Sequence, residues 1–79
     1  MQANESLSVT REVVYELVGK QIADDQPIIS SGMIDSLSIL KLISMLEEKL
    51  GINIPTAEVQ PDDFDTIELT TETIERVTT

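Results

Sequence analysis

The stretch GMIDSLSILKLISMLEEKLG, residues 32–51, contains the strongest helix signal in the chain. At about 100° per residue, the apolar side chains of residues 36–50 fall on one stripe, which predicts a helix with one face on a core. The members of the stripe are Ile39, Leu42, Ile43, Leu46 and Leu50. Asp35 is a favourable N-cap residue, and Gly51 suits the position just after the last turn.

A first helix is predicted before this stretch. Apolar residues at helical spacing indicate a helix over about residues 9–22, with Ser6 or Ser8 as its N-cap. Residues 23–35, with a proline, two adjacent serines and a glycine, predict a loop. This loop is too apolar for a free linker, so we expect it to lie over the core.

The segment after Gly51 contains two prolines and predicts a loop with a short helical turn near residues 62–65. A last helix is expected from Thr66 or Thr70 to about Val77. No stretch shows convincing strand alternation. The sequence therefore predicts an all-α fold, a small bundle of three main helices plus a short helical turn. We expect a single domain over residues 1–79, with an ordered core over roughly 9–77.

The composition restricts the chemistry that this chain can perform. Its 79 residues contain no His and no Cys, which excludes a Ser-His-Asp or Cys-His arrangement and argues strongly against a zinc site. A core of this size also leaves little room for a deep catalytic pocket. We therefore expect the protein not to be an enzyme, and we expect no metal site of its own.

The charge of the chain restricts its partners. A net charge of −10 argues against nucleic acid and against anionic membrane surfaces, and it favours basic protein partners. No apolar run approaches the roughly 18 residues that a membrane span needs, and the polar N-terminus lacks the basic region of a signal peptide. We expect a monomeric cytoplasmic protein without membrane insertion.

The predicted second helix also has apolar residues away from its core stripe. Leu37 and Leu40 point roughly opposite that stripe, and Met45 lies toward the same outer side. This arrangement indicates a docking patch for a partner. The alternative is that the helix is buried more widely, for instance under residues 23–35.

Ser36 has two explanations at this point. Asp35 and Ser36 both suit a helix start, so Ser36 could simply help to begin the helix. It could instead be a hydroxyl offered to another enzyme, because a phosphate on that oxygen would be favoured at a helix N-terminus. Asp35 would repel that phosphate, which makes more sense if a modifying enzyme reads Asp35, for example through a metal ion. Without a histidine to act as a base, Ser36 is better suited to be acted on than to act.

The residues around Ser36 resemble a known family. Gly32-Met33-Ile34-Asp35-Ser36-Leu37 is similar to the 4′-phosphopantetheine attachment motif of acyl and peptidyl carrier proteins. The stretch LKLISMLEEKLGINIP, residues 40–55, resembles the second helix and following loop of that family, and PDDFDTI, residues 61–67, resembles its third segment. The resemblance covers roughly residues 9–77.

This resemblance implies a function. Ser36 would carry 4′-phosphopantetheine, transferred from coenzyme A by a phosphopantetheinyl transferase, and Asp35 would contribute to recognition. The protein would shuttle an acyl or aminoacyl group as a thioester from an adenylating ligase to a downstream acyltransferase or synthase, without catalysis of its own. The docking residues would be Leu37, Leu40, Lys41, Met45, Glu47 and Glu48.

Three alternatives for the function remain open in the sequence. The Ile before Asp-Ser-Leu and the P-D-D-F-D-T segment are similar to stand-alone carriers of specialised pathways, including aminoacyl carriers of natural products and D-alanyl carriers of the cell envelope. Primary fatty-acid synthesis is the second alternative, although Ser38 and Lys41 interrupt the acidic second helix typical of those carriers. The third is an unmodified helical adaptor, which would tolerate loss of the Ser36 hydroxyl.

Overall fold

The computed structural model describes residues 3–78, which form helices and loops without any strand. The predicted all-α fold of three main helices is confirmed. A short helical turn lies close to the predicted one, and a second, unpredicted turn precedes it. In chain order the elements are α1 (Ala3–Val18), α2 (Ser36–Leu50), η1 (Thr56–Glu58), η2 (Pro61–Phe64) and α3 (Ile67–Thr78).

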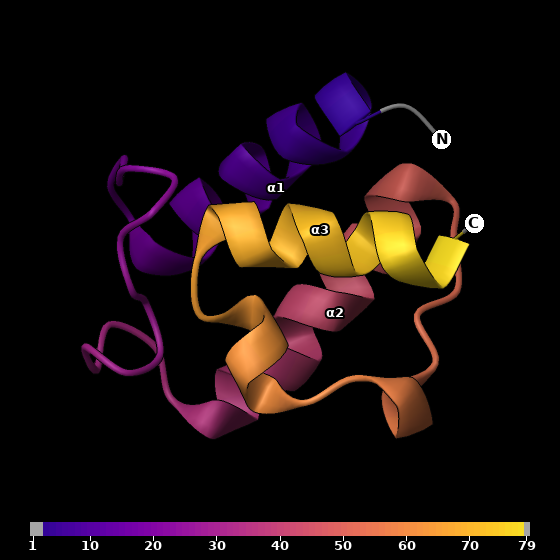
Figure 1. Cartoon of the computed structure of the whole chain (residues 1–79). Coiled ribbons are helices and arrows are strands. Elements are labelled where there is room, and N and C mark those ends of the chain that lie inside the picture. Colours follow the sequence, from indigo (N-terminus) through magenta and orange to yellow (C-terminus); the bar gives the residue numbers. More distant parts are fainter. Residues whose placement is uncertain (1–2, 79) are drawn as a thin grey trace.

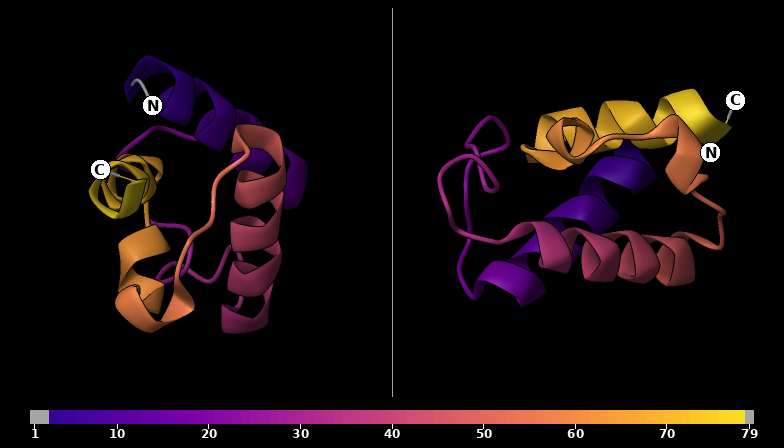
Figure 2. Two further views of the ribbon diagram at one scale, coloured as in Figure 1. Left: turned by 90° about the vertical axis from the view of Figure 1, so that its right-hand side faces the viewer. Right: turned by 90° about the horizontal axis from the view of Figure 1, so that it is seen from below.

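The three helices pack around one hydrophobic core. α1 packs against both α2 and α3, and η2 packs against α3 and α2. Figure 1 shows α3 in front of α1 and α2, with the long α1–α2 loop along one end of the molecule. The left panel of Figure 2 looks almost along α3 and shows α2 from the side, so these two helices are not parallel. None of the helices in residues 3–78 combines the length and apolar character that crossing a membrane requires.

α2 begins and ends where the sequence predicts. The Asp35 side chain accepts a hydrogen bond from the Ser38 backbone N–H, which satisfies one free donor of the first turn. At the other end Gly51 adopts a left-handed conformation with φ 65°, and its N–H donates to the Glu47 carbonyl. All five residues of the predicted stripe are buried. The two caps and the apolar stripe together fix the position and orientation of the helix start.

α1 differs from its predicted range at both ends. It begins at Ala3, so Ser6 lies inside the helix and the prediction that Ser6 or Ser8 caps it is wrong. Ser6 and Thr10 are fully buried and continue the inward stripe with small polar side chains, which an apolar periodicity does not detect. The helix stops at Val18 because Gly19 takes a positive φ of 86°. Ile22, expected within the helix, packs on the core from the loop instead.

α3 depends on packing more than on helix propensity. Thr66 caps it, since Thr66 Oγ1 accepts from the Leu69 N–H at 2.9 Å. Several threonine hydroxyls inside the helix donate to the carbonyl four residues earlier, a pattern that slightly weakens helices. These residues are Thr70, Thr71, Thr73 and Thr78. Its buried face is formed by Ile67, Thr70, Thr73 and Ile74.

The loop over residues 19–35 lies against the core, as its apolar residues predict. Ile28 and Ile34 are buried, and Met33 packs beside them. Near its start the loop is tied to two helices through Asp24. Arg11 of α1 forms a two-point ion pair with the Asp24 carboxylate at 2.6 and 3.0 Å, and the Asp24 carbonyl accepts from the Glu68 N–H at 3.0 Å.

Candidate functional site

Ser36 is the first residue of α2, and its side chain is exposed. Its hydroxyl makes no hydrogen bond to any group in residues 3–78. The capping bonds belong to its neighbour, because Asp35 Oδ1 accepts from the Ser38 N–H at 2.9 Å and from Ser38 Oγ at 3.0 Å. Ser36 therefore does not start the helix with its side chain, and its hydroxyl remains available to another molecule.

The electrostatics at this helix start favour a negative charge. The hydrogen bond from the Ser38 N–H, together with the one from its hydroxyl, lowers the pKa of the Asp35 carboxyl below its ordinary value. Asp35 is thus ionised at neutral pH beside the positive end of the α2 dipole. A second anion on Ser36 would interact with the same dipole and would also be repelled by Asp35.

The loop before Ser36 is a closed structure. Its two buried ends are joined by a hydrogen bond from the Ile34 N–H to the Ile28 carbonyl at 2.9 Å. Between them Gly32, with φ 83°, makes the turn and donates to the Ile29 carbonyl at 3.0 Å. Ser31 Oγ donates to the Pro27 carbonyl at 2.6 Å. The chain therefore enters Asp35 and Ser36 from an ordered loop that is anchored in the core.

A surface cleft of about 170 Å³ opens beside Ser36. α2 forms one wall, through residues that include Ser36, Leu40 and Ile43. The other wall comes from the segment containing η1 and η2, through residues that include Pro61 and Phe64. The cleft is partly open to solvent and small, so it suits a short chemical group better than a long chain.

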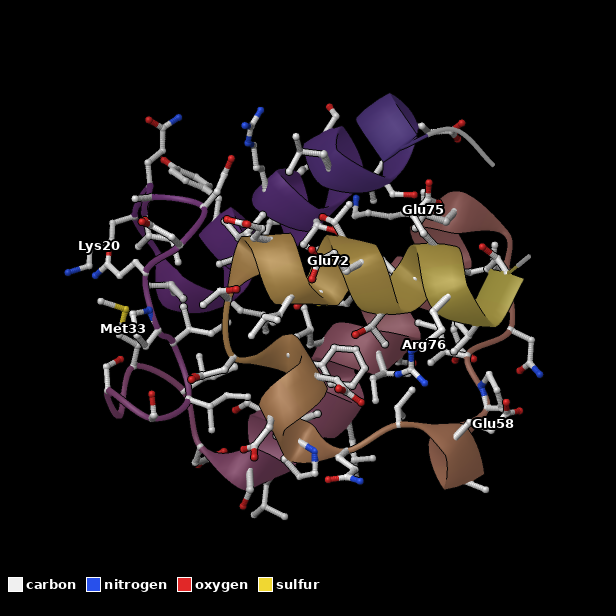
Figure 3. The ribbon with its side chains drawn as sticks, in the orientation of Figure 1. Lys20, Met33, Glu58, Glu72, Glu75 and Arg76 are labelled. Carbon is white, nitrogen blue, oxygen red and sulfur yellow. The ribbon has the colours of Figure 1, made fainter. Side chains whose placement is uncertain are left out.

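Arg76 of α3 holds the segment that forms this second wall. Its Nη1 lies 3.4 Å from the Glu58 carbonyl of η1, and its Nη2 lies 3.3 Å from Asp63 Oδ2 of η2. Figure 3 shows Arg76 close to Glu58 on this side of the molecule. The same Asp63 oxygen accepts from the Gln60 N–H at 2.8 Å. The wall is thus tied to α3 by polar contacts.

The predicted docking patch is only partly on the surface. Leu37 and Leu40 are 78% and 63% exposed, the largest values among the exposed large apolar side chains. Met45 is half-buried and packs against the core. The helical wheel places Met45 on the outer side, but its long side chain bends back over the core. Lys41 is exposed and forms no ion pair with any group between residues 3 and 78.

The two adjacent glutamates of α2 differ in their surroundings. Glu48 is exposed, whereas Glu47 is half-buried. Glu47 Oε2 accepts a hydrogen bond from the Ile54 N–H at 2.8 Å, and the Glu47 carbonyl accepts from Gly51 and Ile52. Glu47 therefore secures the turn after α2, and its carboxylate is less free to meet a partner than that of Glu48.

Asp65 belongs to an acidic cluster with Asp62 and Asp63, and the sequence pattern predicts for this cluster only a favourable charge near a helix start. In the structure, however, the Asp65 carboxylate binds the loop before Ser36. No group of three or more potential metal ligands lies together within the described part of the chain. A larger cleft than the one beside Ser36, of about 390 Å³, lies at the end of α1 and is lined by residues such as Tyr15, Lys20 and Ile67.

Comparison with known proteins identifies the family. Residues 8–74 match the family model described as a phosphopantetheine attachment site. The chain belongs to the phosphopantetheine-attachment family of carrier proteins. The match covers most of the chain, including α2 and all the elements that surround its first turn.

Several relatives of this carrier are D-alanyl carrier proteins. The relative from Leuconostoc citreum is 33% identical over 57 residues, covering 70% of this chain and 73% of its own. The relative from Streptococcus sanguinis is 32% identical, covering 70% and 72%, and that from Lactobacillus acidophilus is 28% identical, covering 70% and 72%. The predicted carrier function, with covalently bound 4′-phosphopantetheine, is therefore confirmed.

Proposed function

We propose that 4′-phosphopantetheine is attached to Ser36 Oγ and that this carrier transports a small aminoacyl group. The observation that carries the attachment site is the exposed Ser36 hydroxyl, which has no hydrogen bond within residues 3–78 and no capping role. When bound, the group supplies a terminal thiol on which the cargo is held as a thioester. The chain itself contains no cysteine that could compete for that cargo.

The surroundings of Ser36 fit such a modification. A phosphodiester on Ser36 Oγ would lie at the N-terminus of α2, where unpaired backbone N–H groups and the helix dipole favour negative charge. Asp35 Oδ2 takes neither of the two bonds that Oδ1 accepts from Ser38. We expect this oxygen to meet the magnesium ion of the phosphopantetheinyl transferase, which would also relieve its repulsion of the phosphate.

A short aminoacyl cargo, with D-alanine as the first candidate, agrees with two features of this chain. The cleft of about 170 Å³ beside Ser36 has space for a short group, and the relatives named above are D-alanyl carriers. In addition, α2 has no formal net charge, because Lys41 and Lys49 balance Glu47 and Glu48. Enzymes with strongly basic docking surfaces would be recruited less efficiently by such a helix.

The partners follow from this assignment. We expect a phosphopantetheinyl transferase, an adenylating aminoacyl ligase and a downstream acyltransferase or synthase to bind in turn at the exposed residues of α2. The protein would act as a monomeric, single-domain, non-catalytic shuttle in the cytoplasm, where coenzyme A and ATP are available. Carriage of fatty acyl groups is the second candidate, and an unmodified adaptor is disfavoured by the family match.

Intact-mass measurement tests the proposal. The folded wild type is incubated with coenzyme A, magnesium and a broad-specificity phosphopantetheinyl transferase, beside Ser36→Ala and Ser44→Ala. Ser44 is an exposed serine on the same helix and serves as the matched control. We expect one phosphopantetheine on the wild type and on Ser44→Ala, and none on Ser36→Ala. A modified Ser36→Ala variant, or an unmodified folded wild type, would overturn the assignment.

A second assay tests the cargo. The modified carrier is incubated with ATP and a D-alanine-activating ligase, or with a fatty-acyl ligase and its substrate. We expect a D-alanyl thioester, seen as a mass gain that hydroxylamine removes. Loading with the fatty acyl group alone would favour the second candidate.

A further inference from the structure

The carboxylate of Asp65 connects η2 to the loop that precedes Ser36. Asp65 follows η2 directly, and its Oδ1 accepts from the Ile29 N–H at 2.8 Å and from the Ser30 N–H at 2.9 Å. Its Oδ2 accepts from Ser30 Oγ at 2.8 Å. The Asp65 carbonyl adds a fourth bond, from the Ile28 N–H at 2.7 Å. One residue thus binds three consecutive residues of the loop.

The loop that Asp65 binds leads directly to Ser36 along the chain. Ile28 and Ile34 are buried and hydrogen-bonded to each other, so the loop between them has fixed ends. Asp65 holds the first half of that loop, and the residue after Ile34 is the cap of α2. Only Asp35 separates Ile34 from the proposed attachment residue. A change in the loop therefore alters the direction in which the chain enters α2.

The same contacts determine the spacing of the cleft beside Ser36. Phe64, which precedes Asp65, is fully buried and lines the wall opposite Ser36. Because Asp65 joins this wall to the loop that leads into α2, it ties the two sides of the cleft together. Asp62, in the same segment, has no such position. Its side chain is exposed and forms no hydrogen bond or ion pair within residues 3–78.

We infer that Asp65 is a positioning residue for phosphopantetheine transfer, holding the 28–34 loop so that the Ser36 hydroxyl is presented in one geometry. This inference rests on the proposed attachment at Ser36. Asp65 does not touch the reacting atoms; it acts through the loop. Misplacement of a reacting group by about 1 Å can lower a rate by up to about a hundredfold, so loosening this loop should lower the rate of transfer.

The test compares Asp65→Ala, Asp65→Asn and Asp62→Asn in steady-state transfer from coenzyme A. Asp65→Ala removes all three side-chain bonds. Asn retains an oxygen for the Ile29 and Ser30 N–H groups and an amide that can donate to Ser30 Oγ, but it lacks the charge. Asp62→Asn makes the same charge change in the same segment without touching the loop.

We expect Asp65→Ala to lower kcat about tenfold or more, with a much smaller change in KM, and to speed amide exchange in residues 28–34. Asp65→Asn should restore most of the rate, and Asp62→Asn should match the wild type. A role as a charged contact for the transferase predicts the opposite result, in which both Asp65 variants raise KM equally; that result would overturn the inference.

A further variant covers the case in which Asp65→Ala does not fold. Ser30→Ala removes only the bond to Oδ2 and should lower kcat a few-fold, whereas a wild-type rate would count against the inference. Failure of the attachment proposal is distinguishable, because it appears as modification of Ser36→Ala or as a folded wild type that is not modified. Normal transfer to a folded Asp65→Ala variant, with Ser36→Ala unmodified, would overturn only the positioning role.

Discussion

Glu47 Oε2 accepts a hydrogen bond from the backbone N–H of Ile54 at 2.8 Å, and this bond joins α2 to the loop that follows it. Ile54 is 2% exposed, so water cannot easily replace this bond. The neighbouring Glu48 carries the same charge but is exposed on α2. Glu47 therefore has a structural role, whereas the carboxylate of Glu48 is free to meet a partner.

Glu47→Ala is therefore expected to destabilise the protein, because it leaves a buried N–H without its charged acceptor. A loss of about 1–2 kcal/mol in the free energy of unfolding is expected. Glu48→Ala should change it by less than about 0.5 kcal/mol. Urea unfolding followed by circular dichroism measures both; equal losses in the two variants would contradict the structural role of Glu47.

Thr10→Val is expected to stabilise the protein. Thr10 is fully buried, and its hydroxyl has no hydrogen-bond partner in the described part of the chain. Replacing an unsatisfied hydroxyl with a methyl group should raise the free energy of unfolding by about 1 kcal/mol. Thr73→Val is the contrasting variant and should lower it, since Thr73 Oγ1 contacts the carbonyls of Leu69 and Asp63. A destabilised Thr10→Val variant would show that this hydroxyl has a partner in solution.

Leu40→Ala is expected to weaken docking without weakening the fold. Leu40 is 63% exposed beside the proposed attachment site, so its truncation should alter stability by less than about 0.5 kcal/mol. If it anchors partners, KM for the transferase or the ligase should rise about fivefold or more. Leu69→Ala, on α3 and 41% exposed, is the control and should leave KM unchanged. Equal effects of both variants would contradict a docking patch on α2.

Lys41→Glu is expected to change the choice of partner. Lys41 is an exposed cation without an ion pair to any of the residues 3–78, on a helix that is otherwise weakly charged. An acidic residue here should improve loading by enzymes with basic docking surfaces, mainly through a faster association rate. It should slow loading by the ligase that normally acts on this carrier. If the loading rates are unchanged both with an enzyme that has a basic docking surface and with the carrier's own ligase, Lys41 lies outside the contact area.

The pH dependence of stability should change in Asp35→Asn. The folded-state pKa of Asp35 is lowered by its bonds to Ser38. The contribution of the ionised Asp35 to the free energy of unfolding is therefore complete above the unfolded-state pKa of about 3.9. It is lost as the pH falls through the folded-state pKa. Because Asn caps helices as well as Asp does, the two proteins should have similar stability at pH 7. As the pH falls from about 5 to 2, the wild type should lose more of its free energy of unfolding than Asp35→Asn, as measured by urea midpoints. Parallel plots of stability against pH for the two proteins would contradict the lowered pKa of Asp35.

Much of this architecture can be predicted from local patterns in the sequence. The α2 stripe, its Asp35 cap and its Gly51 end are all encoded within one short segment. The resemblance around Ser36 likewise predicts the family that the comparison identifies. In these cases each residue reports on neighbours within one or two turns.

Other features depend on contacts between distant residues. The start of α1 is missed because Ser6, which lies before the predicted range, is polar and yet buried. The role of Asp65 is missed because its partners Ile29 and Ser30 precede it by 36 and 35 positions. A carboxylate of this kind looks like any solvated acid until the fold brings the loop to it.

The threonine-rich α3 determines where the native protein should open first. Its hydroxyls bond within the helix, and its intrinsic preference for helix is modest, so it depends on its neighbours for order. Amide exchange should therefore be fastest there among the three helices, while α2, with both caps in place, exchanges most slowly. An opening that begins at α3 would free η2 and loosen the cleft wall while the Ser36 end of α2 stays formed. Because Asp65 directly follows η2 and binds Ile29 and Ser30, the same opening would loosen the loop before Ser36. The space available to the cargo and the presentation of Ser36 would therefore change together.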